Sequence, residues 1–203
     1  MAALCLREQD FDPDPMKQFR AWLEDALNAK LVQPLGMTLA TAGRNCKPSA
    51  RMVLLRGLDE KGFVFFTNYD SRKSGELDEN PWASLVFYWA ELDRQVRVEG
   101  PAERVSKEES DAYYQTRARG SQLGAWASPQ SQVVPDRAFL DRSMQEFAAR
   151  YQTGPVPRPP HWGGYRVIPD LIEFWQGQEN RLHDRLRYRK LESGTWLLER
   201  LAP

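Results

Sequence analysis

Residues 82–105, WASLVFYWAELDRQVRVEGPAERV, decide the fold that this sequence predicts. The segment contains two runs rich in Val, Leu, Phe and Tyr, residue types that favour β-strands. Only the turn signal Leu92-Asp93 separates the two runs. Because a connection this short joins neighbouring antiparallel strands, the segment predicts a β-hairpin.

The same strand-like pattern continues on both sides of this hairpin. Upstream, three further runs are separated by short turn signals: GMTLATA at 36–42, SARMVLLRGL at 49–58 and FVFFTN at 63–68. Downstream, strand character returns at 165–175, 185–190 and 195–201. The five strands between residues 36 and 105, with their short connections, predict an antiparallel meander that closes into a β-barrel.

Three helices are expected around this barrel. The first begins at the Asp14-Pro15 cap and continues to about residue 29. The second begins at the capping box 106–109 and should carry Tyr113 and Arg117. The third should run over residues 135–151, with five apolar side chains facing inward: Phe139, Leu140, Met144, Phe147 and Ala148.

Length and composition favour one globular domain. The chain has 203 residues, of which 41% are hydrophobic, and this is enough for a substantial core. We interpret the proline-rich residues 154–160 as a stiff connector, because the segment that follows is too short to fold alone. We therefore predict a single α+β, mainly β, domain over residues 1–203, with a flexible N-terminal segment over residues 1–13.

Charge and residue counts exclude several classes of protein. Lys and Arg number 28 and Asp and Glu also number 28, so a broad nucleic-acid-binding surface is not expected. The N-terminus has no apolar core of signal-peptide length, and no run reaches the roughly 18 apolar residues of a membrane span, so we expect a cytoplasmic protein. Two cysteines and two histidines cannot assemble the usual zinc site, and no metal is expected.

The first of three polar segments suggests a phosphate site. It combines a strand with Arg51 and Arg56 at its ends, a neighbouring strand that ends at Thr67, and the basic pair Arg72-Lys73 at an expected helix start. Such donors at one end of a sheet suit an anion with several acceptor oxygens. The alternative is that Arg72 and Lys73 are solvated loop charges.

The second polar segment is Tyr113-x3-Arg117-x3-Ser121. Steps of four residues put Tyr113 and Arg117 on one helical face, with Ser121 next along it if the helix continues through Gly120. One cation and two hydroxyls would form a clamp for a second phosphate. A surface helix with an incidental tyrosine and arginine fits the same spacing.

The third polar segment is EFWQGQENRLHDR at 173–185. If it is extended, Arg181, His183 and Arg185 alternate to one face. A histidine in this setting suits a hydrogen-bond partner near neutral pH. A structural histidine and a basic patch for RNA are the alternatives, and the absence of a wider positive field argues against RNA.

Longer motifs in these segments resemble the pyridoxine (pyridoxamine) 5′-phosphate oxidase family. From about Asp14 to the C-terminus, the sequence contains PSARMVLLRG, FFTNYDSRKSGEL, NPWASLVFYW, RQVRVEGPAERV, SQLGAW, WGGYRV, EFWQGQENRLHDR and ERLAP. The resemblance implies an FMN-binding split β-barrel, Greek-key-like and with packed helices, that forms a homodimer with each FMN between subunits. It also implies a vitamin B6 enzyme, pyridoxal 5′-phosphate synthase, which oxidises pyridoxine 5′-phosphate or pyridoxamine 5′-phosphate and reduces dioxygen to hydrogen peroxide.

The resemblance also implies which residues form the site. FMN contacts are expected at Arg51, Met52, Val53, Leu54, Leu55, Arg56, Phe66, Thr67, Arg72, Lys73, Gln95, Gln130, Ser131, Trp175 and Arg185. Substrate contacts are expected at Arg56, Tyr113, Arg117, Ser121, Arg181 and His183, with Arg181 and His183 catalytic. The family usually has lysine where this chain has Arg56, whose larger planar fork is expected to change substrate affinity.

Two other functions compete with this one. Another FMN split-barrel oxidoreductase would share the barrel, but it would give no reason for Tyr113, Arg117, Ser121, Arg181 and His183 to occur together. A protein that binds FMN or pyridoxal phosphate without turnover would need only the phosphate clamps, and it would not need the Arg181-Leu182-His183 set.

Overall fold

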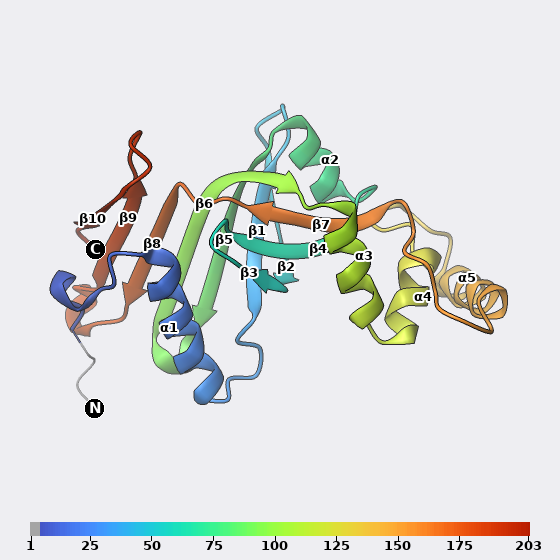
Figure 1. Cartoon of the computed structure of the whole chain (residues 1–203), viewed down its shortest axis with the longest axis horizontal. Coiled ribbons are helices and arrows are strands. Elements are labelled where there is room, and N and C mark those ends of the chain that lie inside the picture. The colour runs from blue at the N-terminus through green and yellow to red at the C-terminus, as the bar shows by residue number, and fades with distance from the viewer. Residues whose placement is uncertain (1–4) are drawn as a thin grey trace.

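The computed structural model describes residues 5–203, which form five α-helices, three short 3₁₀-helices and ten strands (Figure 1). The α-helices are α1 (Pro15–Asn28), α2 (Arg72–Glu79), α3 (Lys107–Thr116), α4 (Arg119–Ala127) and α5 (Arg137–Arg150). The strands are β1 (Gly36–Ala42), β2 (Pro48–Leu54), β3 (Gly57–Leu58), β4 (Phe63–Asn68), β5 (Trp82–Trp89), β6 (Arg94–Arg104), β7 (Trp162–Val167), β8 (Leu171–Gln176), β9 (Asp184–Lys190) and β10 (Trp196–Arg200). The 3₁₀-helices are η1 (Glu8–Asp10), η2 (Ala90–Leu92) and η3 (Glu179–Arg181).

The strands form one curled antiparallel sheet, which confirms the predicted mainly β class. The strand order is β10-β9-β8-β6-β5-β1-β2, and β3, β4 and β7 form a branch that joins β6 through β7. The predicted meander is wrong in its order, because β1 lies between β2 and β5 and β4 pairs with β7. The predicted strand 49–58 breaks after buried Leu55. The Leu55 amide still donates to the Leu35 carbonyl, next in the β1–β2 register, but the Arg56 amide donates to the Val64 carbonyl on β4.

Strand β6 belongs to both parts of the sheet. Residues 94–101 pair with β5 and residues 94–99 with β8, whereas the last three residues pair with β7. Gly100 marks the change, because a Cβ there would lie 1.9 Å from the Ile168 carbonyl oxygen. A residue with a side chain would force this crossing apart, so glycine is required where the two parts meet.

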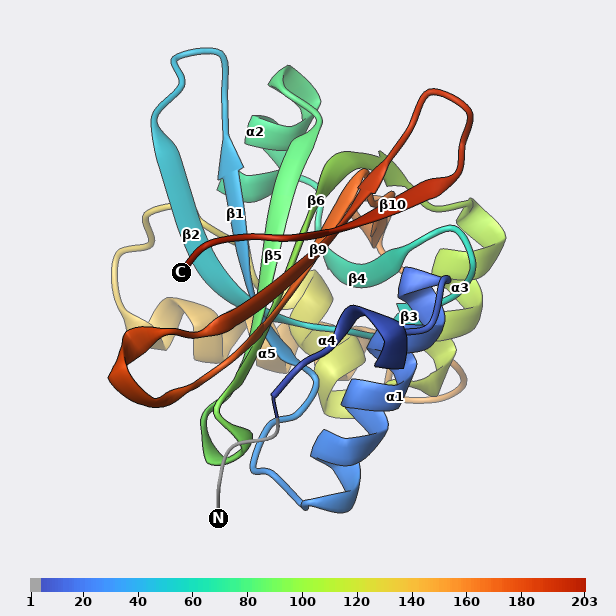
Figure 2. The same cartoon turned by 90° about the vertical axis from the view of Figure 1, so that its left-hand side faces the viewer.

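Helix α1 covers the core side of the sheet (Figures 1 and 2). Asp14 caps it by accepting from the Met16 amide at 2.8 Å, as the sequence predicts. Its buried face includes Phe19 and Trp22, which pack edge-on against Phe63 and Phe174. Each such side chain contributes about 2–3 kcal/mol of burial, so the helix is firmly anchored on the sheet.

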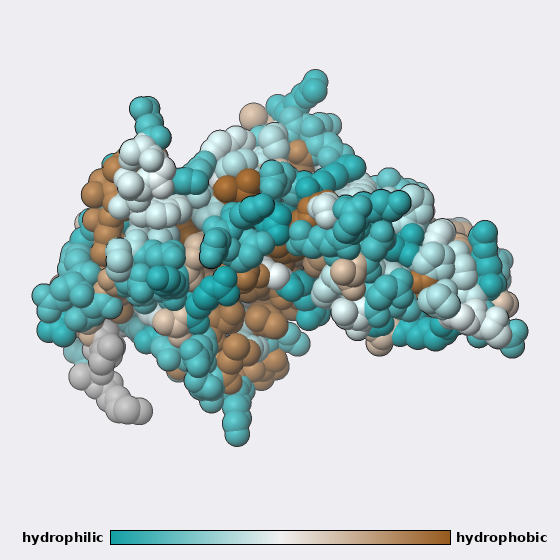
Figure 3. Space-filling model, in the orientation of Figure 1, coloured by the Kyte–Doolittle hydropathy of each residue, from teal (hydrophilic) through white to brown (hydrophobic). Residues whose placement is uncertain are grey.

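A second, smaller cluster lies at the helical end, where Tyr114, Leu123, Val156 and Trp162 are buried. Helix α5 packs on its outside and has no buried residue, although its sequence predicts five inward side chains. Phe139, Leu140, Met144 and Phe147 are half-buried, and Ala148 is exposed. The projecting α4–α5 end is mostly hydrophilic or neutral on its surface (Figure 3), consistent with a peripheral helix rather than a core one.

Residues 5–13 lie along the β9–β10 end of the sheet, although the sequence predicts a flexible segment over residues 1–13 (Figure 2). Leu6 is buried, and its amide donates to the Asp184 carboxylate at 3.0 Å. Arg200 donates to the Leu6 carbonyl at 2.6 Å and to Glu8 at 2.7 Å. Residues 1–4 of the predicted segment lie outside the described residues. None of the helices in residues 5–203 has the length and apolarity needed to cross a membrane.

Candidate active site

A cavity of about 440 Å³ opens beside the edge strand β2, within the size range of small-molecule sites. Strands β2 and β4 and helix α2 form one side, and the α3–α4 turn and the start of β7 form the other. The lining residues are Arg51, Met52, Val53, Leu54, Arg56, Phe66, Thr67, Lys73, Tyr113, Arg117, Gln130 and Trp162. The fold therefore brings the first two predicted segments together in one cavity.

The edge position of β2 explains why consecutive residues line the same cavity. Alternate side chains of a strand leave opposite faces, and β2 follows this rule, with Arg51 and Val53 half-buried and Met52 and Leu54 exposed. Within residues 5–203, β2 pairs only with β1, so its other edge is free, and four consecutive residues of β2 line the cavity. A free edge also offers unpaired backbone donors and acceptors to a ligand.

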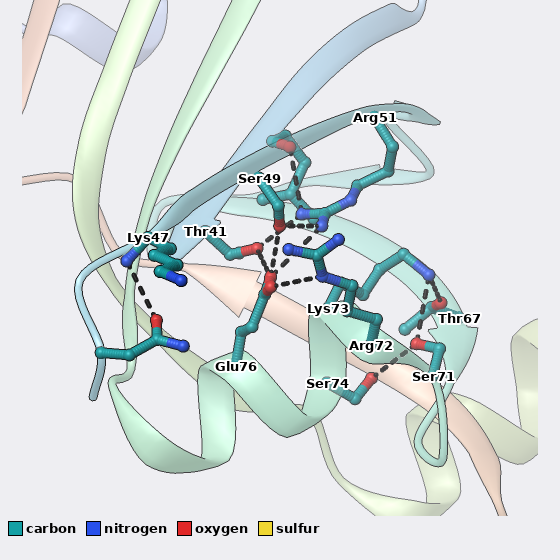
Figure 4. Close-up of polar contacts among 12 residues, drawn as sticks. Thr41, Lys47, Ser49, Arg51, Thr67, Ser71, Arg72, Lys73, Ser74 and Glu76 are labelled. Carbon is teal, nitrogen blue, oxygen red and sulfur yellow. Dashed lines mark hydrogen bonds and ion pairs between the residues drawn. The ribbon is translucent and has the colours of Figure 1, made fainter. Parts of the chain in front are cut away.

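Lys73 forms the buried cationic centre of the cavity (Figure 4). It lies in the first turn of α2, and its Nζ donates to the Thr67 hydroxyl at 3.0 Å and the Ser71 hydroxyl at 3.1 Å. It also donates to the Gln130 side-chain oxygen at 2.8 Å. Burial, and secondarily the charge of Arg51, lower the pKa of Lys73 to about 8. The alternative that Lys73 is a solvated loop charge is therefore wrong, whereas Arg72 is exposed and does not line the cavity.

Glu76, one turn along α2, joins two of the cations (Figure 4). One of its carboxylate oxygens accepts from Arg51 at 3.2 Å, and the other accepts from Arg72 at 2.8 Å. Hydroxyls of Thr41 and Ser49 donate to the same carboxylate at 2.6 and 2.5 Å. Although burial alone raises the pKa of Glu76, the hydrogen bonds from Ser49, Thr41, Arg72 and Arg51 lower it to about 2.

Arg117 forms a second cationic centre in the same cavity. The predicted helical face is wrong in detail, because α3 ends at Thr116 and Arg117 has an extended backbone, yet Tyr113 and Arg117 both line the cavity. The guanidinium lies over the Trp162 ring at 4.6 Å, and its buried Nη1 has no hydrogen-bond partner among residues 5–203. Burial lowers the pKa of Arg117. An unpaired buried cationic donor that faces a cavity fits an anionic ligand.

Ser121 lies close to Arg117, at an adjoining cavity of about 230 Å³ on α4. Arg117, Gln130 and Trp162 line both cavities. The Tyr113 ring stacks on Phe66 at 4.0 Å, and Trp162 lies parallel to both rings. The arrangement offers an aromatic wall beside an anion-binding guanidinium.

Gln95, Trp175 and Arg185 form a separate cluster on the outer face of the sheet. They are register neighbours on β6, β8 and β9, and they alternate with the fully buried Val96, Phe174 and Leu186. The Arg185 guanidinium donates to Glu173 at 2.8 Å and to the Ala202 carbonyl at 2.9 Å. From β9 to β2 there are five strand spacings and from β6 to β2 three, roughly 24 and 14 Å along the sheet, and none of the three residues lines the cavity of its own chain.

Arg181 and His183 lie at the same end of the sheet, on the turn between β8 and β9. The predicted alternation is wrong, because Asn180 and Arg181 adopt left-handed backbone angles with φ of 54° and 61°. Arg181 is exposed. The His183 ring lies 4.6 Å from that of Trp175, and its Nδ1 accepts from the Gln178 amide at 3.1 Å, so a neutral ring carries its proton on Nε2.

Two more of the expected contacts lie away from the cavity. Leu55 is part of the main core, and Ser131 is exposed with a φ of 71°. Sequence reasoning missed Trp162 and Glu76. The spacing of Arg72 and Glu76 is the four-residue step of a helical ion pair, a signal that was sufficient to find Glu76.

Comparisons with protein-family models identify the family of the chain. A family model described as pyridoxamine 5′-phosphate oxidase matches residues 23–151. A second model, the pyridoxine 5′-phosphate oxidase C-terminal dimerisation region, matches residues 162–203. The chain belongs to the pyridoxamine 5′-phosphate oxidase family. Both clusters of polar residues fall within these matched segments.

Relatives of the family resemble the chain over nearly its whole length. The pyridoxine/pyridoxamine 5′-phosphate oxidases of Rubrobacter xylanophilus and Acaryochloris marina are 59% and 57% identical over 198 residues, or 98% of this chain and 91% and 90% of theirs. PhzG from Burkholderia lata, in complex with tetrahydrophenazine-1-carboxylic acid, superposes with a TM-score of 0.93 at 32% identity, over 100% of this chain and 99% of that one. An FMN-binding protein from Nostoc punctiforme shares the fold, with a TM-score of 0.74 at 21% identity over 91% and 97% of the two chains.

Proposed function

We propose that this member of the family is an FMN-dependent oxidase that converts pyridoxine 5′-phosphate or pyridoxamine 5′-phosphate into pyridoxal 5′-phosphate. The observation that carries the proposal is the presence of two cationic centres in one cavity, at Lys73 and at Arg117. Two phosphorylated molecules, the cofactor and the substrate, need two such centres. The unpaired Nη1 of Arg117 is a donor that no residue of the described chain satisfies.

The residues around Lys73 fit the phosphate of FMN. Lys73, Thr67 and Gln130 would hold its oxygens, and the free edge of β2 at residues 51–54 would lie along the flavin. When bound, FMN would accept the hydride, which carries the two electrons that leave the substrate. The protein's own task is then to bind, to orient and to exclude water.

The residues around Arg117 fit the substrate. Arg117, Tyr113 and Ser121 would hold its phosphate, and Arg56 at the cavity mouth adds a further cation. The aromatic wall of Phe66 and Tyr113 suits a flat pyridine ring nearby. Uniform binding of this kind sets substrate affinity more than turnover.

Arg181 and His183 would act at the C4′ carbon of the substrate. Oxidation of the alcohol removes a hydride from C4′ and a proton from its oxygen, giving the aldehyde. With the amine, the resulting imine takes up water and releases ammonia, and in both cases dioxygen accepts two electrons and two protons to form hydrogen peroxide. We assign Arg181 to orienting the oxygen or nitrogen on C4′, and His183 to accepting or positioning its proton.

A homodimer would unite the cavity beside β2, the buried half-site, with the cluster on β6, β8, β9 and the η3 turn, the exposed half-site. Met52 and Leu54 line the cavity and lie on the same outer face of the sheet as Trp175 and Arg185, which follows from the ladder registers. A second copy docked on this face would bring its Trp175, Arg185 and η3 turn to the cavity. The family match of residues 162–203 to a dimerisation region supports this arrangement.

One alternative substrate class has structural support. PhzG resembles the chain closely and holds a ring with a carboxylate and no phosphate. Arg117 would bind either anion, but a carboxylated tricyclic ring leaves Ser121 and Arg56 without a phosphate to bind. We therefore favour the phosphorylated pyridine.

An aerobic assay of purified protein tests the function. Pyridoxine 5′-phosphate should yield pyridoxal 5′-phosphate and hydrogen peroxide in equal amounts, and the protein should carry a yellow flavin. Unphosphorylated pyridoxine is the matched control, and tetrahydrophenazine-1-carboxylic acid tests the alternative. A colourless protein that FMN does not reconstitute would contradict every flavin function, and turnover of the phenazine alone would reassign the substrate.

A further inference from the structure

The cationic cluster around β2 and α2 contains an anion of its own. Arg51, Arg72 and Lys73 contribute three positive charges, and Glu76 contributes one negative charge among them (Figure 4). The Glu76 side chain is only 13% exposed. The remaining charge of +2 matches a phosphate dianion.

Three elements of the fold hold the Glu76 carboxylate in place. Thr41 on β1 and Ser49 on β2 donate hydroxyl hydrogens to it, and Glu76 itself projects from α2. Arg51 donates to the Oε2 atom of Glu76, which also accepts from the two hydroxyls, and to the Leu39 carbonyl. Two hydroxyl donors directed at one carboxylate form a built anion site, and a side chain of the protein fills it.

Glu76 uses donors that a phosphate would need. Both terminal nitrogens of Arg51 are engaged, Nη1 by Leu39 and Thr41 and Nη2 by Ser49 and Glu76. Arg72 is 63% exposed, and its only ion-pair partner among residues 5–203 is Glu76. Lys73 donates to its own three acceptors, and none of them is Glu76.

We infer that Glu76 is an internal counter-ion that stabilises this cluster of positive charges and competes with the cofactor phosphate for Arg51 and Arg72. The inference rests on the proposed flavin site. In the absence of a phosphorylated ligand, Glu76 satisfies the two arginines. When a phosphate binds, Arg72 is free to leave Glu76, because no other residue in the described range 5–203 holds its guanidinium.

Glu76→Gln isolates the charge from the geometry. A glutamine has the same shape, its oxygen still accepts from an arginine, and its amide can donate to the Thr41 and Ser49 hydroxyls. Glu79→Gln is the matched control, because Glu79 lies on the same helix with the same charge, and it accepts from the Arg44 amide rather than from the cluster. Titration of flavin-free protein with FMN and with riboflavin, followed by flavin fluorescence, separates phosphate binding from ring binding.

Glu76→Gln should lower the dissociation constant of FMN roughly three- to tenfold at low salt and leave that of riboflavin unchanged. The gain should shrink at high salt, and the empty variant should melt at a lower temperature than the wild type. Glu79→Gln should change FMN binding less than about twofold. Unchanged or weaker FMN binding in Glu76→Gln, with riboflavin unaffected, would overturn the inference and make Glu76 an orienting residue.

Two further measurements keep the test decisive. If Glu76→Gln does not fold, Glu76→Asp keeps the charge but withdraws the carboxylate by one methylene, and it should tighten FMN binding by a smaller factor. If wild-type protein binds neither flavin, the proposed function fails by itself. The inference is then tested with inorganic phosphate, which should raise the melting temperature of Glu76→Gln more than that of the wild type.

Discussion

The cavity beside β2 and the cluster on β6, β8 and β9 differ in how their polar groups are held. In the cavity, Lys73 is buried and makes three hydrogen bonds within its own chain, and Arg117 lies buried over Trp162. In the sheet cluster, Arg181 is exposed on a turn, and Trp175 and Arg185 line neither the cavity beside β2 nor the adjoining cavity on α4. The polar groups of the cavity are held in place by one chain, whereas the sheet cluster lies on the outer face of the sheet, away from that cavity.

The backbone of the η3 turn strengthens this contrast. Asn180 and Arg181 are consecutive non-glycine residues with left-handed φ, a conformation that costs roughly 1 kcal/mol or more per residue. Because Arg181 is exposed, burial of its side chain does not offset this cost. We interpret the backbone of this turn as what directs Arg181 away from its own chain, toward a ligand bound by a second copy of the chain.

The largest effect is expected from the exposed half-site. Arg181→Ala should reduce turnover at least tenfold and leave FMN bound, because we assign this side chain to the C4′ group of the substrate and not to the flavin phosphate. Steady-state kinetics and the flavin absorbance of the purified variant measure both quantities. Arg189→Ala, an exposed arginine on neighbouring β9, is the control for general loss of charge. Wild-type turnover in Arg181→Ala would remove this residue from the mechanism.

The buried half-site should respond in a different kinetic constant. Arg117→Ala should raise the Michaelis constant for pyridoxine 5′-phosphate about tenfold with a smaller change in kcat, because it removes phosphate binding common to ground and transition states. Arg119→Ala, two residues along and bonded to the Gly154 carbonyl, is the matched control. Loss of FMN from Arg117→Ala would show that the two cationic centres do not serve separate ligands.

The sequence predicts which residues belong to the two regions, but it does not predict how far apart the regions lie in the fold. Strand alternation, the Ser71-Arg72-Lys73 helix start and the motif matches identify Lys73, Arg117 and Arg181. Local patterns do not encode that β1 pairs with β5, and this long-range pairing puts four strands between β2 and β9. The left-handed turn at Asn180 and the break at Leu55 also escape the pattern, because burial and backbone angles depend on the packed fold.

The pH dependence of cofactor binding tests the buried character of Lys73. Burial lowers its pKa to about 8, whereas an unfolded lysine titrates near 10.4, so the unfolded chain holds more protons between these values and this group's contribution to stability rises with pH there. Phosphate binding has the opposite sign, because the anion prefers charged Lys73. The dissociation constant of FMN should therefore rise about fivefold, relative to riboflavin, from pH 7.5 to pH 9. Lys73→Arg should abolish the difference, since arginine stays charged; an unchanged slope in this variant would assign the titration to another group.

Mixed dimers compare the two regions most directly. If each site combines the cavity of one subunit with the η3 turn of the other, a hybrid of Arg117→Ala and Arg181→Ala contains one intact site and one doubly altered site. Random exchange of equal amounts makes half of the dimers hybrid, so the mixture should recover about a quarter of wild-type activity at substrate concentrations well below the Michaelis constant of Arg117→Ala. If both half-sites belong to one chain, every site in the mixture keeps one substitution and no activity returns. Mixing each variant with itself is the control. If activity returns only when the two variants are mixed, the exposed cluster of one chain must complete the buried cavity of another.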